Sequence, residues 1–156
     1  MNKTLPKDEV FKLWVLLHQT RHVVFKIREK ELKKYGISVM ESGVLFILHT
    51  LGGKSTPAEI SRWIFREHHT VSALLERMQK KGLIKKARDP NRKNIWSVSL
   101  TEKGRNAYSN STKMDSLYNA ISALSENECK QLESILRKMR DRALKRTVGE
   151  PTIPFP

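Results

Sequence analysis

The sequence of 156 residues has little cysteine, few acidic side chains and no long apolar run. The single cysteine, Cys129, excludes an intramolecular disulfide and a cysteine-rich zinc site, and it suits a reducing compartment. The longest apolar runs, among them residues 44–48, fall far short of the ~20 residues that a membrane-spanning helix requires. The first residues lead into Leu-Pro-Lys-Asp-Glu rather than an apolar stretch. We therefore expect no signal peptide, no membrane association and a cytoplasmic location.

The sequence also lacks motifs of catalysis and metal binding. It has no glycine-rich phosphate loop, no GxSxG, no HExxH and no paired carboxylates with polar support, and it has only seven glycines. The adjacent His68 and His69 cannot both lie on one helix face, and no group around them completes a metal site. We expect His68 to turn partly towards the core and His69 to be exposed. The sequence predicts neither an enzyme nor a cofactor or metal site.

Basic side chains are abundant, with 30 Lys and Arg against 16 Asp and Glu and a formal net charge of +14. Residues 54–100 contain eleven basic and four acidic side chains, so they carry half of the net charge. Between Arg77 and Lys93, eight basic residues face only Asp89. A solvated basic surface is one interpretation. Because the run coincides with the structural motif below, we favour a nucleic-acid footprint.

Capping signals and apolar spacing predict a mostly helical chain. Three helix starts match the capping box, in which a hydroxyl and a carboxylate satisfy reciprocal backbone amides: Ser38 with Glu41, Thr56 with Glu59, and Ser125 with Glu128. Six helices are predicted, over residues 8–34, 38–51, 56–65, 67–81, 101–123 and 125–146. Two strands are predicted over 83–88 and 95–100. The order of helix, helix and hairpin indicates a winged helix-turn-helix, mostly α with a small β-hairpin wing.

The helix predicted over 67–81 has the pattern of a DNA-reading helix. Its apolar residues recur at i, i+3, i+4 and i+7 and should face the core: Val71, Leu74, Leu75 and Met78. The N-terminal residues of such a helix reach base edges first. We expect bases or nearby phosphates to be contacted by Arg66, His69, Thr70 and Ser72, a close approach or a thymine methyl contact at Ala73, and phosphate contacts from Arg77 and Lys80.

The turn at residues 89–94 should form the tip of the wing. Arg92 can reach a narrow minor groove there, because the negative potential of an A·T stretch favours a guanidinium. Asp89 either holds Arg92 or another wing arginine in position or serves as a plain Asp-Pro turn residue. The other wing residues of the predicted DNA-contacting set are Arg88, Lys93 and Asn94.

The first and last helices carry apolar side chains that a compact wing motif cannot cover. Residues 8–34 hold at least ten of them, and the last helix has one apolar face: Leu132, Ile135, Leu136, Met139 and Ala143. We expect these helices to form a homodimer, the alternative being that they pack on each other within one subunit. The chain is then a single domain over 1–156. Its expected parts are dimerisation helices at 8–36 and 101–146, a DNA-binding lobe at 38–100 and a Pro-rich tail at 147–156 that is loose or docks on the partner.

Several motifs together resemble the MarR family of bacterial transcription regulators. They are Leu83-Ile84, Asp89-Pro90-Asn91-Arg92-Lys93 and Val98-Ser99-Leu100-Thr101-Glu102-Lys103-Gly104. The family's recognition helix is similar to Thr70-Val71-Ser72, Leu75-Glu76-Arg77-Met78 and Lys81-Gly82-Leu83. The resemblance covers about residues 10–145, with its specific part in 56–104.

The resemblance implies a triangular homodimer whose outer helices interlock, with each winged motif on one half of a palindromic operator. It implies repression by obstructing polymerase and, for many members, release by a small phenolic or other aromatic anion. The family's wing arginine corresponds to Arg92 and its supporting acid to Asp89. Asn91 and Lys93 depart from the family's usual Asp and Arg. Some relatives sense peroxides through a cysteine in the first helix, whereas Cys129 lies in the last.

An effector site is predicted on the first helix, where aromatic, imidazole and guanidinium groups recur at i, i+4, i+7 and i+8: Trp14, His18, Arg21 and His22. Trp63 and Phe65 are available from the neighbouring lobe. Such a set could bind an aromatic carboxylate through charge-assisted hydrogen bonds. Packing at a dimer interface with a polar rim is the competing interpretation.

The predicted function is a sequence-specific regulator of transcription that binds double-stranded DNA as a homodimer, most simply a repressor. The alternative is a basic architectural protein, or an RNA-binding wing domain, that coats nucleic acid without operator specificity. The exposed side of the helix at 67–81 mixes His, Thr, Ser and Arg rather than uniform lysine. This mixture favours base reading over the alternative.

Overall fold

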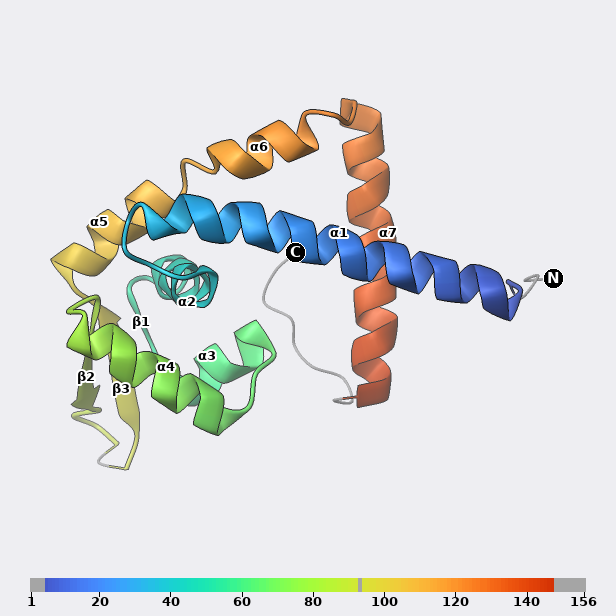
Figure 1. Ribbon diagram of the computed structural model, residues 1–156. Helices are drawn as coiled ribbons and strands as arrows, with labels where there is room; N and C mark the ends of the chain where they lie inside the picture. The colour runs from blue at the N-terminus through green and yellow to red at the C-terminus, as the bar shows by residue number, and fades with distance from the viewer. Residues whose placement is uncertain (1–4, 93, 148–156) are drawn as a thin grey trace.

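The computed structural model of the chain describes residues 5–92 and 94–147. The helices in these residues are α1 (Lys7–Lys33), α2 (Val39–Thr50), α3 (Pro57–Ile64), α4 (His68–Lys80), α5 (Glu102–Ser111), α6 (Asp115–Ile121) and α7 (Glu126–Thr147). The strands are β1 (Lys54–Ser55), β2 (Ile84–Arg88) and β3 (Trp96–Leu100). The elements α2, α3, α4 and the strands gather into one lobe, and α1 runs past it as a long helix (Figure 1).

The predicted winged helix-turn-helix architecture is confirmed, with two differences in the elements. The helix expected over 101–123 is divided into α5 and α6, because Met114 has a left-handed backbone with φ of 51° that a continuous helix cannot include. The strand β1 was not expected from the sequence. It has only two residues, too few for an alternating pattern to be visible.

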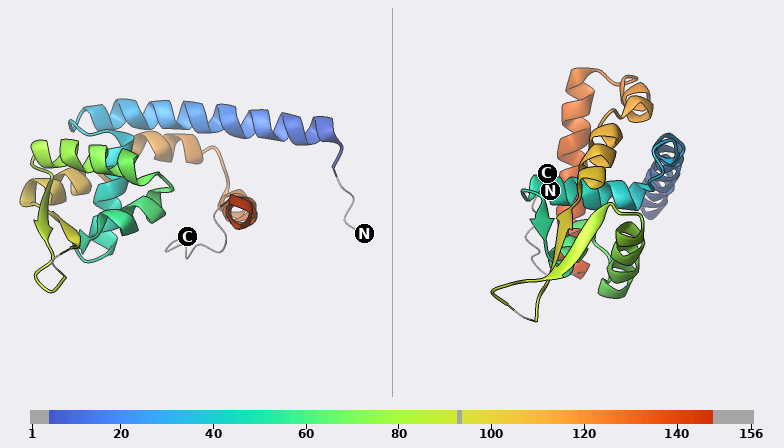
Figure 2. Two further views of the ribbon diagram at one scale, coloured as in Figure 1. Left: turned by 90° about the horizontal axis from the view of Figure 1, so that it is seen from below. Right: turned by 90° about the vertical axis from the view of Figure 1, so that its left-hand side faces the viewer.

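The three strands form one small antiparallel sheet in the order β1-β3-β2. In the hairpin, Ile84 pairs with Leu100 at the base and Arg88 pairs with Trp96 at the outer end. The short β1 covers the other edge of β3 through the pair Ser55 and Val98. The hairpin therefore has a buried base and an outer end that projects beyond the lobe as a wing (Figure 2).

The core of the lobe lies between α2, α3, α4 and the base of the hairpin. Its largest fully buried side chains include Leu45, Leu48, Ile60, Leu75 and Val98. The stripe predicted on the helix at 67–81 is confirmed, since the residues of α4 that are buried are Val71, Leu74, Leu75 and Met78. Burying each of these side chains contributes about 1.5–3 kcal/mol, so the stripe holds α4 firmly on the core.

A buried carboxylate joins the start of α2 to the end of α4. Glu41 is only 3% exposed, and it accepts hydrogen bonds from the Ser38 amide at 2.8 Å and from the Lys81 ammonium at 2.9 Å. The Ser38 hydroxyl accepts from the Glu41 amide at 3.1 Å, which completes the predicted capping box. Lys81 also donates to the carbonyl of Gly36 at 3.1 Å. One glutamate thus links the α1–α2 turn, α2 and α4.

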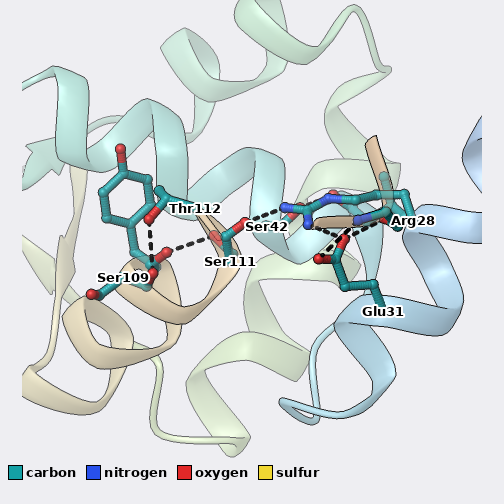
Figure 3. A network of polar contacts seen from close by, with 9 residues as sticks. Arg28, Glu31, Ser42, Ser109, Ser111 and Thr112 are labelled. Atoms are coloured by element: carbon teal, nitrogen blue, oxygen red, sulfur yellow. Dashed lines mark hydrogen bonds and ion pairs between the residues drawn. The ribbon is translucent and has the colours of Figure 1, made fainter. Parts of the chain in front are cut away.

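A second buried polar network joins α1 to α5 and α6 (Figure 3). The Arg28 guanidinium donates to Glu31 at 2.7 Å and also to the backbone carbonyl of Ser111. Glu31 accepts from the Ser116 hydroxyl at 2.5 Å. Burial raises the pKa of Glu31, but the hydrogen bonds from Ser116 and Arg28 outweigh it and hold that pKa below its ordinary value. The ion pair is satisfied on every side, so it can fix the direction in which α1 leaves the lobe.

Gly104 illustrates how closely α5 packs on the hairpin. A Cβ atom at this position would lie 2.0 Å from the carbonyl oxygen of Leu83. Backbone atoms cannot move aside as a flexible side chain can, so only glycine fits here.

We expect Gly104→Ala to lower the free energy of unfolding by about 1–3 kcal/mol because of this clash. Urea unfolding followed by circular dichroism measures the change. The control is Gly43→Ala in the middle of α2, where an added Cβ meets nothing within 4 Å and should stabilise the helix by about 0.5–1 kcal/mol. Equal effects of the two variants would contradict the close approach.

Candidate nucleic-acid interface

The turn between α3 and α4 determines where α4 begins. Phe65 ends α3 in the left-handed conformation with φ of 53°. The Ser61 hydroxyl then donates to the carbonyl of Arg66 at 2.5 Å, and the Arg66 amide donates to the carbonyl of Ser61 at 3.2 Å. These two bonds fix the chain just before α4 begins at His68.

The predicted DNA-contacting residues of this segment are all exposed, and they lie away from the buried stripe: Arg66, His69, Thr70, Ser72, Ala73, Arg77 and Lys80. The expectation for His68 was wrong, because this side chain is exposed and not turned towards the core. It occupies the first position of α4, where the apolar stripe has not yet begun. Both histidines therefore lie at the N-terminal end of the helix, free of the core.

The start of α4 differs from the starts of α2, α3 and α5, each of which has a side-chain cap. Glu67 precedes α4 without a side-chain cap hydrogen bond. The first amides of a helix have no partner within it, and the helix dipole favours negative charge at that end. Uncapped amides beside exposed Arg66 and His69 are suited to a phosphate group.

The wing turn is organised by Asp89. Its carboxylate accepts hydrogen bonds from the amides of Asn91 at 2.9 Å and of Arg92 at 3.1 Å. The bond from the Asn91 amide, together with that from Arg92 and the charge of Lys54, lowers the pKa of Asp89. The Asp89 carboxylate therefore organises the turn and also holds the backbone of Arg92.

The predicted contact residues of the wing occupy its outer end. Arg92 and Asn94 are exposed in the turn, and Arg88 is exposed at the last pair of the hairpin. Lys93 lies outside the described residues. The turn is closed by hydrogen bonds from the Asp89 amide to Ile95 at 2.8 Å and from the Ile95 amide to Arg92 at 2.9 Å.

Trp96 is a wing residue whose role the sequence did not reveal. It pairs across the hairpin with Arg88, whose guanidinium carbon lies 5.1 Å from the centre of the indole ring. The Lys86 ammonium lies 5.6 Å from the same ring. A cation over an indole contributes about 0.5–1 kcal/mol at exposed sites. The Trp96 ring therefore lies under two cations of the neighbouring strand, and only the strand register shows this.

The four residues predicted to bind an effector lie on the N-terminal two-thirds of α1, and all are exposed: Trp14, His18, Arg21 and His22. The rings of Trp14 and His18 stack with centroids 5.8 Å apart, and Arg21 lies 5.4 Å from the centre of the Phe25 ring. Trp63 packs against the lobe core, and Phe65 is exposed at the end of α3. A single chain thus presents these four side chains on an open helix surface.

Neither a membrane-spanning helix nor a metal-binding cluster occurs in the described part of the chain. No helix in it is long and apolar enough to cross a membrane. No group of three or more His, Cys, Asp or Glu side chains in it could hold a metal ion.

Comparison with known proteins agrees with this geometry. A family model described as the MarR family matches residues 35–93. The organohalide sensing RdhR-CbdbA1625 transcriptional regulator, solved with 2,4-dichlorophenol bound, is 30% identical with a TM-score of 0.86. That alignment covers 98% of this chain and 92% of the other. The chain belongs to the MarR family of transcription regulators.

Two further similar structures were solved with DNA. A mutant MarR from E. coli, complexed with operator DNA, is 21% identical with a TM-score of 0.78 over 87% of this chain and 99% of that one. The S. aureus MepR–DNA complex is 25% identical with a TM-score of 0.73 over 80% of this chain and 93% of that one. At 21% identity, the likeness to the E. coli protein concerns the fold alone. No curated protein matches the sequence.

In this MarR-family wing, we expect Asp89→Ala to weaken duplex binding several-fold, because Asn91 and Arg92 lose the acceptor for their amides. Asp89→Asn keeps a side-chain oxygen at the same place and should bind more tightly than Asp89→Ala. Fluorescence anisotropy with a labelled duplex measures both. Equal affinity of Asp89→Ala and the wild type would show that the turn does not need this acceptor.

Proposed function

We propose that this MarR-family regulator binds double-stranded DNA as a homodimer and represses transcription from a palindromic operator in the bacterial cytoplasm. Each protomer would place α4 in the major groove of one half-site and its wing in the adjacent minor groove. The observation that carries the proposal is that α4 has two different faces. One face is a buried apolar stripe, and the other is exposed, polar and basic. The exposed basic wing lies beside it in the same lobe.

Sequence-specific reading is supported by the chemistry of the exposed side of α4. Thr70 and Ser72 can donate to or accept from base edges, and small Ala73 allows a close approach or a thymine methyl contact. Arg77 and Lys80 lie further along the helix, where phosphate contacts would fix its register. Uniform lysine would attract the backbone but would not distinguish one sequence from another.

Dimerisation is supported by large apolar side chains that a single chain leaves in water. Phe11 is 62% exposed on α1 and Ile135 is 53% exposed on α7, and many neighbours on both helices are exposed as well. Neither α6 nor α7 contains a buried residue. An exposed apolar surface of this extent marks a protein interface. We assign 8–36 and 101–146 to this interface and 38–100 to DNA binding; residues 148–156 of the tail lie outside the described residues.

A small phenolic or other aromatic effector is part of the proposal. The related organohalide-sensing regulator was solved with 2,4-dichlorophenol bound. In this chain, the ring stack of Trp14 with His18, next to Arg21 and His22, offers aromatic surface and donors for an anion. These residues become enclosed only if a partner chain covers α1, so the effector site would lie where the dimer helices meet the lobe.

The main experiment is a gel shift with the DNA immediately upstream of the protein's own gene and a scrambled duplex of equal length at about 150 mM salt. A specific regulator should prefer the first duplex by about 4–10 kcal/mol. Equal retardation would favour the architectural alternative or an operator elsewhere. A selection from random duplexes separates those two cases, because only a regulator enriches a defined sequence.

We expect Arg92→Ala to weaken binding to the preferred duplex by about 1–3 kcal/mol, because a minor-groove guanidinium is lost. Lys80→Ala should instead weaken binding to all duplexes alike. It should also reduce the slope of log binding constant against log salt concentration by about one. Anisotropy titrations over a range of salt concentrations measure both variants. An unchanged affinity of Arg92→Ala would remove its minor-groove role.

We expect Ile135→Lys to weaken the dimer by about 3–6 kcal/mol, since a two-fold interface loses two buried isoleucines. Sedimentation velocity measures the change as a shift towards monomer. Ser134→Lys is the control, because it adds the same charge to α7 away from the apolar face. Dimers of equal stability in both variants would contradict the assigned interface.

A further inference from the structure

A lysine-lined pocket lies beside the α1–α2 turn, away from the wing and from the N-terminal end of α4. Its volume is about 830 Å³, within the range of small-molecule sites. The lining residues come from the end of α1, the turn, the start of α2 and the end of α4. They are Lys26, Ile27, Glu29, Lys30, Lys33, Gly36, Ile37, Ser38 and Lys81.

Three of the four lysines occupy one face of α1. Lys26, Lys30 and Lys33 are spaced at i, i+4 and i+7, so their ammonium groups are neighbours on the helix surface. Glu29 is the one acid among the lining residues. Within the described part of the chain, none of the three α1 lysines forms an ion pair. Like charges at this spacing repel one another, and an anion in the pocket would relieve that repulsion.

The fourth lysine is held in place. The Lys81 ammonium donates to Glu41 at 2.9 Å and to the carbonyl of Gly36 at 3.1 Å. An ammonium has three donors, so one N–H of Lys81 remains for a ligand. Because Glu41 is buried, moving the Lys81 ammonium away would leave a buried carboxylate without its cation, which is costly. Lys81 is therefore a preorganised donor at the pocket wall.

The lining chemistry selects one class of anion. The pocket contains four lysines and no arginine, so it offers several point charges, the form in which lysine binds phosphate groups. Ile27, Ile37 and the lysine stems supply apolar surface beside these charges. We propose that this pocket binds a small organic phosphate with an apolar or aromatic body, such as a nucleotide.

The pocket lies apart from the base-reading start of α4, although Lys80, a predicted phosphate contact, directly precedes Lys81. Lys81 follows the last residue of α4, whereas Arg66 lies just before the helix and His69 in its first turn. A helix of 13 residues separates the two ends by about 18 Å. The proposal therefore goes beyond the proposed function and does not depend on it.

The test is a titration of the full chain with metal-free adenosine triphosphate at about 150 mM salt, followed by backbone amide NMR spectra. We expect saturable shifts at residues 26–38 and 81. Lys30→Gln with Lys33→Gln should weaken the affinity by about tenfold, as the loss of two charge contacts implies. The control, Lys12→Gln with Lys138→Gln, removes the same charge elsewhere on α1 and α7 and should change the affinity less than twofold.

Three outcomes would overturn the proposal. The first is shifts confined to α4 and the wing, which would mean that the nucleotide imitates DNA. The second is an equal loss of affinity in the pocket variant and the control, which would indicate general charge attraction. The third is equal affinity for citrate, which would exclude selection of phosphate. Circular dichroism of each variant checks that its helices are intact.

Discussion

The burial of one four-residue stripe on α4 is the constraint on which the rest of the lobe depends. Because a helix is rigid, placing Val71, Leu74, Leu75 and Met78 in the core also decides which side chains remain outside. The exposed side then includes the polar start of the helix and its basic end. The packing that stabilises the lobe would thus also present the DNA-contacting side chains of α4. These side chains are positioned by the helix and need no further contacts within the fold.

Two buried carboxylates determine how the other elements are oriented around that stripe. Glu41 joins α2, the α1–α2 turn and Lys81 at the end of α4, and Glu31 joins Arg28 of α1 to Ser116 of α6. Each carboxylate accepts hydrogen bonds from a cationic side chain and from a second donor, as a buried charge requires. Such contacts are directional, whereas apolar packing is not. They can therefore fix the angle between the long α1 and the lobe, and with it the spacing of two lobes in a dimer.

The outer helices follow a different principle from the lobe. The lobe buries its apolar side chains within one chain, whereas α1 and α7 leave theirs exposed. A helix with an uncovered apolar face gains its stability from a partner. The proposed dimer would thus complete the fold as well as position the two recognition helices, and an effector bound between dimer helices and lobe would act on both.

Residue spacing and capping signals predict most of the elements, the α4 stripe, three helix caps and the family, because they are local properties of the chain. The sequence did not show the break at Met114 or the short β1, since neither leaves a periodic signal. Nor did it show that His68 is exposed. Only the tertiary structure brought Arg88 and Lys86 over Trp96, and Lys81 to the lysines of α1. These groups meet through strand register and helix packing, which depend on contacts between residues far apart in the chain.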